Sequence, residues 1–130
     1  MSAATVLRAA ALAALRADPL LGEQANGVYG RVPPGAQPPF LSVPDIASVD
    51  WSTKTARGRE LRLAVLIEVD QADPSPLGPL ADAAETAILA LPRDLPGWRV
   101  ASIVYGRELA SDEGKRRRRL IEFRARVLAT

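Results

Sequence analysis

The sequence lacks cysteine and histidine altogether. Without cysteine, the chain has neither a disulfide nor a thiolate nucleophile, which is compatible with a reducing compartment. Without histidine, it has no imidazole metal ligand, no Ser–His nucleophile system and no ordinary histidine pH switch. These absences exclude metal sites built on thiolates or imidazoles and nucleophile systems built on cysteine or on a Ser–His pair.

A long hydrophobic run is missing too. Residues 1–19 look like a secretion signal at first sight, but the apolar stretch runs only from Ala9 to Leu15 and is flanked by Arg8 and Arg16. A bilayer-spanning helix needs about 20 apolar residues. We therefore predict an ordered amphipathic helix here, with no signal peptide and no association with a membrane.

Lysine is scarce, since only Lys54 and Lys115 among the 17 basic residues are not arginine. The 15 acidic residues leave a formal net charge of +2, which permits weak attraction to polyanions without demanding it. The length of 130 residues and a hydrophobic content of 48% are ordinary for one globular domain. We expect a single domain over residues 1–130.

Hydrophobic periodicity predicts an α+β fold. Helices are expected over residues 3–17, closed by Asp18-Pro19, and over 77–91, closed by Pro92. The clearest strand, 60–70, alternates apolar and polar residues. Further strands are expected at 28–32, at 40–51 with a bend at Pro44, at 97–109, and within 113–127 after a turn at 111–114. The order α-β-β-β-α-β-β predicts a mainly antiparallel sheet of about four to five strands with two helices on one face.

The strongest charge feature is a run of cations just after the expected turn. It consists of Lys115, Arg116, Arg117, Arg118 and Arg119. With a period of two, Arg116 and Arg118 fall on the polar face of the last strand, whereas Arg117 and Arg119 continue its apolar face into solvent. Three interpretations remain open: a solvated strand end partly compensated by the acids just upstream, a nucleic-acid-binding patch, or a nuclear-localisation tag.

A second basic segment lies between two expected strands. Trp51 ends one strand, and the loop that follows has no acidic residue until Glu60. Trp51 is either an interface anchor or a residue at the edge of the core. The candidate contact residues of this loop are Trp51, Thr53, Lys54, Thr55, Arg57 and Arg59.

The sequence contains no recognisable enzyme motif. The glycines at 27, 30 and 35 fit no nucleotide-binding fingerprint, and no Gly-x-Ser-x-Gly elbow occurs. Glu60, Glu68 and Asp70 share one strand face, but an exposed strand face explains them better than a pair of catalytic carboxylates. We expect no catalytic residue, no metal site, no cofactor and no enzymatic activity.

The chain as a whole resembles a known family. The segments "GVYGRVP", "PFLSV", "DWSTKTARGRE", "LRLAVLIEV" and "RLIEFRARV" occur in that order after an Ala/Leu/Arg-rich first helix. This pattern is similar to the tail terminator, or tail-completion, proteins of long-tailed phages and of phage-like gene transfer agents. The most specific part is "DWSTKT" followed by "GRE"; the rest is mostly pattern.

The resemblance implies a structural assembly protein. Such proteins form a homohexameric ring at the head-proximal end of the tail tube, stop tube polymerisation, and join the tail to the head connector. The implied partners are further copies of the chain, the major tail tube protein, a head-side connector or stopper, and DNA passing non-specifically through the lumen. The implied location is the neck of a virion or phage-like particle, with assembly in the bacterial cytoplasm. Two alternatives are another head–tail joining ring protein and a small non-specific nucleic-acid-binding protein.

Overall fold

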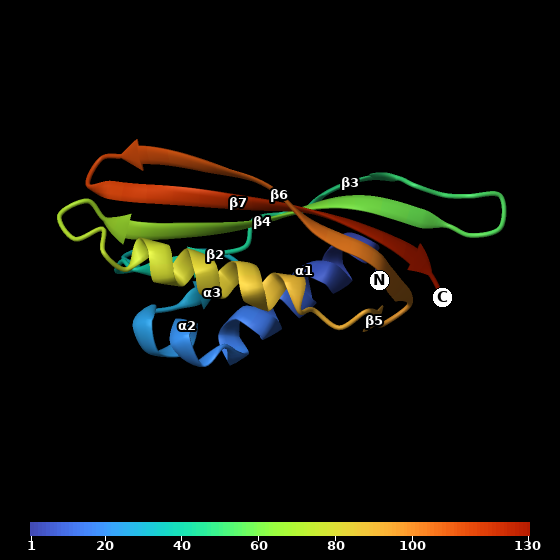
Figure 1. The fold of residues 1–130 in the computed structure, drawn as a ribbon, viewed down its shortest axis with the longest axis horizontal. Coiled ribbons are helices and arrows are strands. Elements are labelled where there is room, and N and C mark those ends of the chain that lie inside the picture. Colours follow the sequence, from blue (N-terminus) through green and yellow to red (C-terminus); the bar gives the residue numbers. More distant parts are fainter.

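The computed structural model describes residues 1–130 and places three helices on one face of a curled sheet (Figure 1). This confirms the α+β class. The helices are α1 (Ala3–Ala17), α2 (Pro19–Gln24) and α3 (Leu77–Leu89). The strands are β1 (Val28–Tyr29), β2 (Phe40–Ser42), β3 (Ala47–Asp50), β4 (Gly58–Asp70), β5 (Asp94–Leu95), β6 (Trp98–Glu113) and β7 (Arg116–Ala129). None of the helices has the length and apolar character needed to cross a bilayer.

The sheet is built around three long strands. Its strand order is β1-β2-β4-β7-β6-β5, and β3 pairs with the first half of β4. Only the β1–β2 pair is parallel; all other pairs are antiparallel. Two register shifts in β6, between Val100 and Ser102 and between Tyr105 and Arg107, increase the local twist. The expected sheet of four to five strands was therefore too small, because the sheet has seven.

The additional helix arises from a dipeptide that was expected only to end α1. The Asp18 carboxylate accepts the backbone N–H of Leu21 at 3.0 Å, and Pro19 occupies the first turn of α2. A capping side chain followed by proline is a strong start signal for a helix. The same two residues thus end one helix and begin the next.

The remaining differences concern the strands. The expected strand 40–51 divides at Pro44 into β2 and β3, which pair with different halves of β4. The two-residue strand β5 was not expected. The expected turn at 111–114 was also misplaced, because Ser111 to Glu113 belong to β6 and the chain reverses at Gly114, whose φ is +58°. A glycine tolerates this left-handed backbone at no steric cost.

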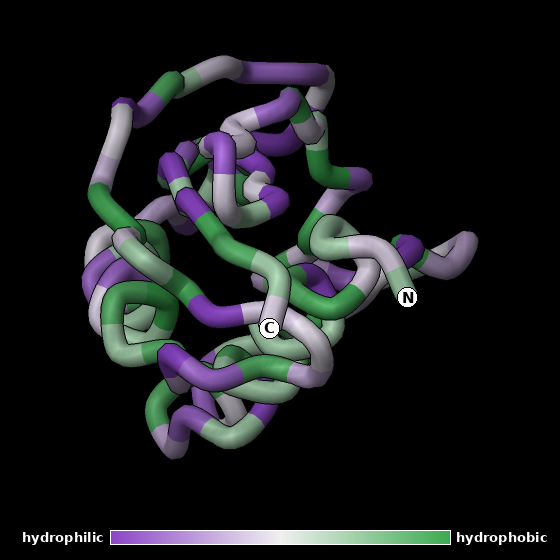
Figure 2. Tube along the Cα trace, turned by 90° about the vertical axis from the view of Figure 1, so that its right-hand side faces the viewer, coloured by the Kyte–Doolittle hydropathy of each residue, from purple (hydrophilic) through white to green (hydrophobic).

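The core lies between the helices and the covered face of the sheet. In β4, the apolar row from Leu61 to Val69 is fully buried, and in β7 the row from Ile121 to Val127 is almost completely buried. These rows pack with side chains of α1 and α3 in one cluster of 26 buried residues. Figure 2, which looks at the end where both termini lie, shows hydrophobic and hydrophilic residues alternating along the trace. The opposite face of the long strands carries no helix.

Candidate functional site

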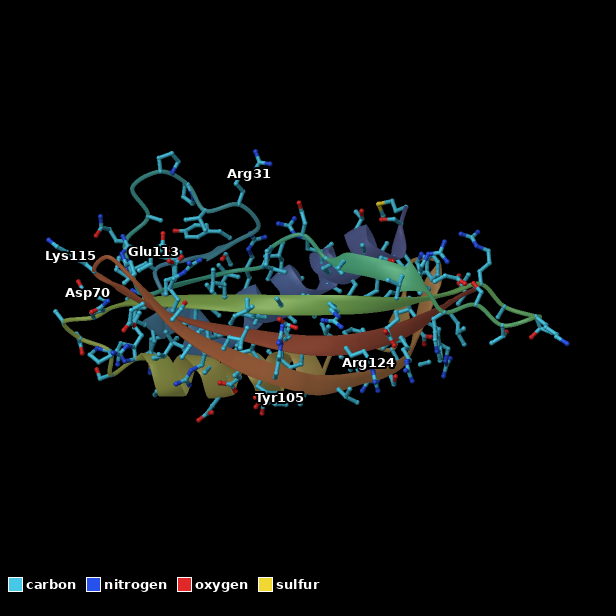
Figure 3. The ribbon with its side chains drawn as sticks, turned by 90° about the horizontal axis from the view of Figure 1, so that it is seen from above. Arg31, Asp70, Tyr105, Glu113, Lys115 and Arg124 are labelled. Atoms are coloured by element: carbon cyan, nitrogen blue, oxygen red, sulfur yellow. The ribbon has the colours of Figure 1, made fainter.

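The β6–β7 turn places the run of cations from Lys115 to Arg119, which we call the basic contact zone, at one end of the long axis (Figure 3). The segment after β4 fastens this turn. The Gln71 backbone N–H donates to the carbonyl of Lys115 at 2.8 Å, and its side-chain amide donates to the carbonyls of Gly114 at 2.9 Å and Arg116 at 3.1 Å. The end of the hairpin is therefore held to β4.

Three arginines of the basic contact zone form ion pairs within the chain. Arg118 Nη1 lies 2.6 Å from Glu113 Oε2. Its Nε lies 3.3 Å from Glu68 Oε1, an ion pair that lacks hydrogen-bond geometry. The other two pairs are Arg117 with Asp112 at 3.1 Å and Arg119 with Glu108 at 3.5 Å. The compensation by upstream acids that the first interpretation required is therefore present.

The other two cations of the zone differ from these three. The Arg116 guanidinium lies 5.7 Å from the centroid of the Phe40 ring, a cation–π contact. Lys115 is exposed and forms no ion pair. Arg117 and Arg119 were predicted to continue the apolar face of the last strand. They do so, because both border a hollow of about 410 Å³ that also includes Leu77 at the start of α3.

The predicted assembly-contact loop, Trp51 to Arg59, extends beyond the sheet at the opposite end from the β6–β7 turn (Figure 1). It is an ordered turn. The Thr53 N–H donates to the carbonyl of Ala56 at 2.8 Å, and the Thr53 hydroxyl accepts the Ala56 N–H at 3.1 Å. The Trp51 ring is half-buried, with the guanidinium of Arg126 at 5.3 Å from its centroid. The ring therefore packs within the chain and keeps part of its surface exposed.

The three cations of this loop differ in their contacts within the chain. Arg59 Nη1 lies 3.1 Å from Asp50 Oδ1, and the Arg57 guanidinium lies 5.9 Å from the Trp98 ring centroid. The pKa of Asp50 is below its usual value, chiefly because the Ser52 hydroxyl donates a hydrogen bond to its carboxylate, with a smaller effect of Arg59. Lys54 is exposed and has no partner in the chain. Thr55 is exposed beside it, and its N–H donates to the Thr53 hydroxyl at 3.4 Å.

The open face of the sheet carries a basic hollow that sequence reasoning missed. It has a volume of about 560 Å³ and includes Arg62, Arg107 and Arg124 together with Glu60 and Glu122. These residues occupy the polar positions of three strands. Their alternation was visible in the sequence, but the register that brings them together was not, because strand pairing depends on the whole sheet.

No group of three or more acidic side chains converges in a way that would hold a metal ion. The prominent features are instead arginine-rich surfaces at both ends and on the open face of the sheet, where most arginines are paired with acids. Such surfaces are suited to contacts with other macromolecules. The fold and these surfaces favour a protein that acts through contacts with other macromolecules.

Comparison with known proteins identifies the family. The family described as "Tail completion protein gp17" matches residues 9–128, and the chain belongs to it. A chain of the solved structure "Virion of native gene transfer agent (GTA) particle" is 28% identical with a TM-score of 0.74, and the match covers 99% of this chain and 100% of that chain. No curated protein matches the sequence.

These findings confirm the resemblance inferred from the sequence. The chain is a structural protein of tail assembly in a virion-like particle, and its family is not an enzyme family.

Proposed function

We propose that this protein forms a ring at the head-proximal end of the tail tube, where it stops tube polymerisation and joins the tail to the head-side connector. Residues 1–130 act in it as one tail-terminator-like domain. The observation that carries the proposal is the family match over residues 9–128, supported by a virion chain of the same fold along its full length.

The shape of the subunit suits a position between two partners. The assembly-contact loop and the basic contact zone lie at opposite ends of the long axis (Figure 1). One end engages the major tail tube protein and the other engages the connector, while the sides of the subunit meet its neighbours. A homohexamer of this kind leaves a central lumen through which DNA passes without sequence-specific contacts.

The charge distribution is compatible with passage of DNA. Ion pairs to Glu68, Glu108, Asp112 and Glu113 compensate three of the four consecutive arginines. A ring built from such subunits does not present the full cationic run to the phosphate backbone. Weak, salt-dependent attraction then replaces a tight grip that would hinder ejection.

The proposal is tested by single-particle electron microscopy of purified particles, with this protein located in the averaged map. We expect a six-fold ring between the tail tube and the connector. A ring on the connector side would instead favour the alternative head–tail joining role. Absence from the neck would contradict the terminator function and favour the nucleic-acid-binding alternative.

Charge reversal tests the assembly-contact loop. Lys54→Glu, Arg57→Glu and Arg59→Glu together should leave the protein folded but yield particles with unjoined or overlong tails, which electron micrographs would reveal. Lys54→Glu alone isolates the outward contact, because Arg57 and Arg59 also contact Trp98 and Asp50. Arg31→Glu, in an exposed segment, is the matched control. Normal particles from the triple variant would remove this loop from the proposed contacts.

A further inference from the structure

The open face of the sheet contains two facing arginines without a counter-ion. Arg62 in β4 and Arg124 in β7 are directly paired in the register, and both are exposed. Neither forms an ion pair or a hydrogen bond. Like charges directly opposite each other on neighbouring strands destabilise a sheet. Figure 3 looks onto this face, with Arg124 on it.

The other arginines around this pair are compensated. Arg126 Nε lies 2.9 Å from Glu60 Oε1, and Arg107 Nη2 lies 3.1 Å from Glu122 Oε1. The acids of the hollow are thus already engaged, and none remains for the facing pair. The hollow presents two uncompensated guanidinium groups side by side, a suitable receptor for two carboxylates.

The same chain offers two such carboxylates on its other side. Asp82 and Glu85 lie on α3, which packs on the covered face of the sheet, and neither forms an ion pair or a hydrogen bond within the chain. Residues three apart on a helix have Cβ atoms about 5–6 Å apart. Directly paired residues of two strands have Cβ atoms about 4.5–5.5 Å apart. The two acids therefore match the two arginines in charge and in spacing.

The surroundings also allow α3 to approach a sheet. Its exposed positions include Gly78 and Pro79, which are small, and Thr86 beside the acids. The open face has no helix of its own. Two apolar side chains of β6 are partly exposed on this side of the sheet, Val104 at 39% and Leu109 at 45%. A helix that covered this face would bury apolar surface as well as pair the charges.

We infer that Asp82 and Glu85 of a second copy of this chain bind Arg62 and Arg124 across the subunit interface of the ring. The contact uses different surfaces of the two subunits, so it is heterologous. Contacts of this type generate a closed ring when the rotation from one subunit to the next adds up to a full turn. The inference rests on the proposed ring and names the residues that hold it together. Passing DNA is the less suitable occupant, because only two uncompensated cations remain in a hollow whose other arginines are paired.

Charge exchange tests this contact in particles assembled with the full chain. Arg62→Glu with Arg124→Glu should reduce the number of particles that carry a neck ring by about tenfold or more, because like charges then face each other across the interface. Asp82→Arg with Glu85→Arg should do the same. The variant with all four changes should restore the ring, since the attraction is re-established with opposite signs. Electron microscopy counts the rings.

The fold itself is controlled in two ways. Replacing the two arginines by glutamates keeps a like-charge pair within the subunit, so its melting temperature should change little. Arg31→Glu with Arg93→Glu reverses two other exposed arginines that have no ion pair and should leave the rings intact.

The remaining outcomes overturn the inference in different ways. Rings that persist in both double variants would exclude this contact, and if delivery of DNA then fell, the arginines would be assigned to the lumen. Rings lost in the arginine variant and not restored by all four changes would exclude Asp82 and Glu85 as the occupants. Wild-type particles without any ring would contradict the proposed function itself, which separates that failure from failure of the contact.

Discussion

Gly58 determines how the assembly-contact loop joins the sheet. It is the first residue of β4, and its carbonyl accepts the Trp51 N–H at 3.0 Å. A Cβ at this position would collide with the carbonyl oxygen of Trp51 and would lie 3.1 Å from Cδ2 of Leu128. The obstacle is backbone, which cannot move aside as a flexible side chain does. A glycine therefore lets the two arms of the loop approach each other.

We expect Gly58→Ala to lower the free energy of unfolding by about 1–3 kcal/mol, the usual cost of overpacking a tight site. Urea denaturation measures this. Gly22→Ala is the control, because Gly22 lies in α2 with no atom within 4 Å of an added Cβ. That change should stabilise the protein by up to about 1 kcal/mol through helix propensity. Equal effects of the two substitutions would contradict the close approach at Gly58.

At the scale of elements, Arg118 links three strands. It lies in β7 and contacts Glu68 of β4 and Glu113 of β6, and its side chain is 29% exposed. The neighbouring Lys115 has the same charge but no partner and lies in the turn. The basic contact zone thus contains one residue that bridges strands, Arg118, and one that has no partner in the chain, Lys115.

Arg118→Gln should lower the free energy of unfolding by about 1 kcal/mol, the upper range for partly exposed ion pairs. Lys115→Gln should change it by less than about 0.5 kcal/mol, as for most surface substitutions. Thermal or urea denaturation distinguishes the two. If both variants lost the same stability, the effect would come from net charge and not from the bridge.

The elements also show what sequence patterns can and cannot establish. Alternation in β4 and β7 correctly predicted which side chains are buried, because a strand with one covered face repeats every two residues. The pattern also placed α1 and α3, and the family resemblance identified the tail-assembly role. The pairing of Arg62 with Arg124 stayed hidden, since register is a property of two distant segments. The helix α2 was missed because its capping residue also ends α1.

At the scale of the whole molecule, charge is distributed in compensated pairs with few free cations. The net charge is +2 although 17 residues are basic. Most arginines of the long strands have an acidic neighbour across the strands, as in the pairs of Glu60, Glu68, Glu108 and Glu122. The long-range field of the isolated protein is accordingly modest.

We therefore expect the purified protein to bind arbitrary duplex DNA more weakly than about 0.1 mM at physiological salt, the weak limit of ordinary non-specific binding. Fluorescence anisotropy over a series of salt concentrations measures it. Micromolar binding that falls steeply with salt, and that disappears when Arg116 to Arg119 are replaced by serine, would contradict this and support the nucleic-acid-binding alternative.

The position of β7 has a consequence for biosynthesis. This strand lies between β4 and β6 at the centre of the sheet, yet it follows every other strand in the chain. Until it has been synthesised, β4 and β6 lack their common partner, and the apolar row of β4 stays without its neighbour. Such non-local pairing slows folding and exposes strand edges to aggregation. The chain can therefore reach its native state only after β7 has been translated, because β4 and β6 pair with each other only through it.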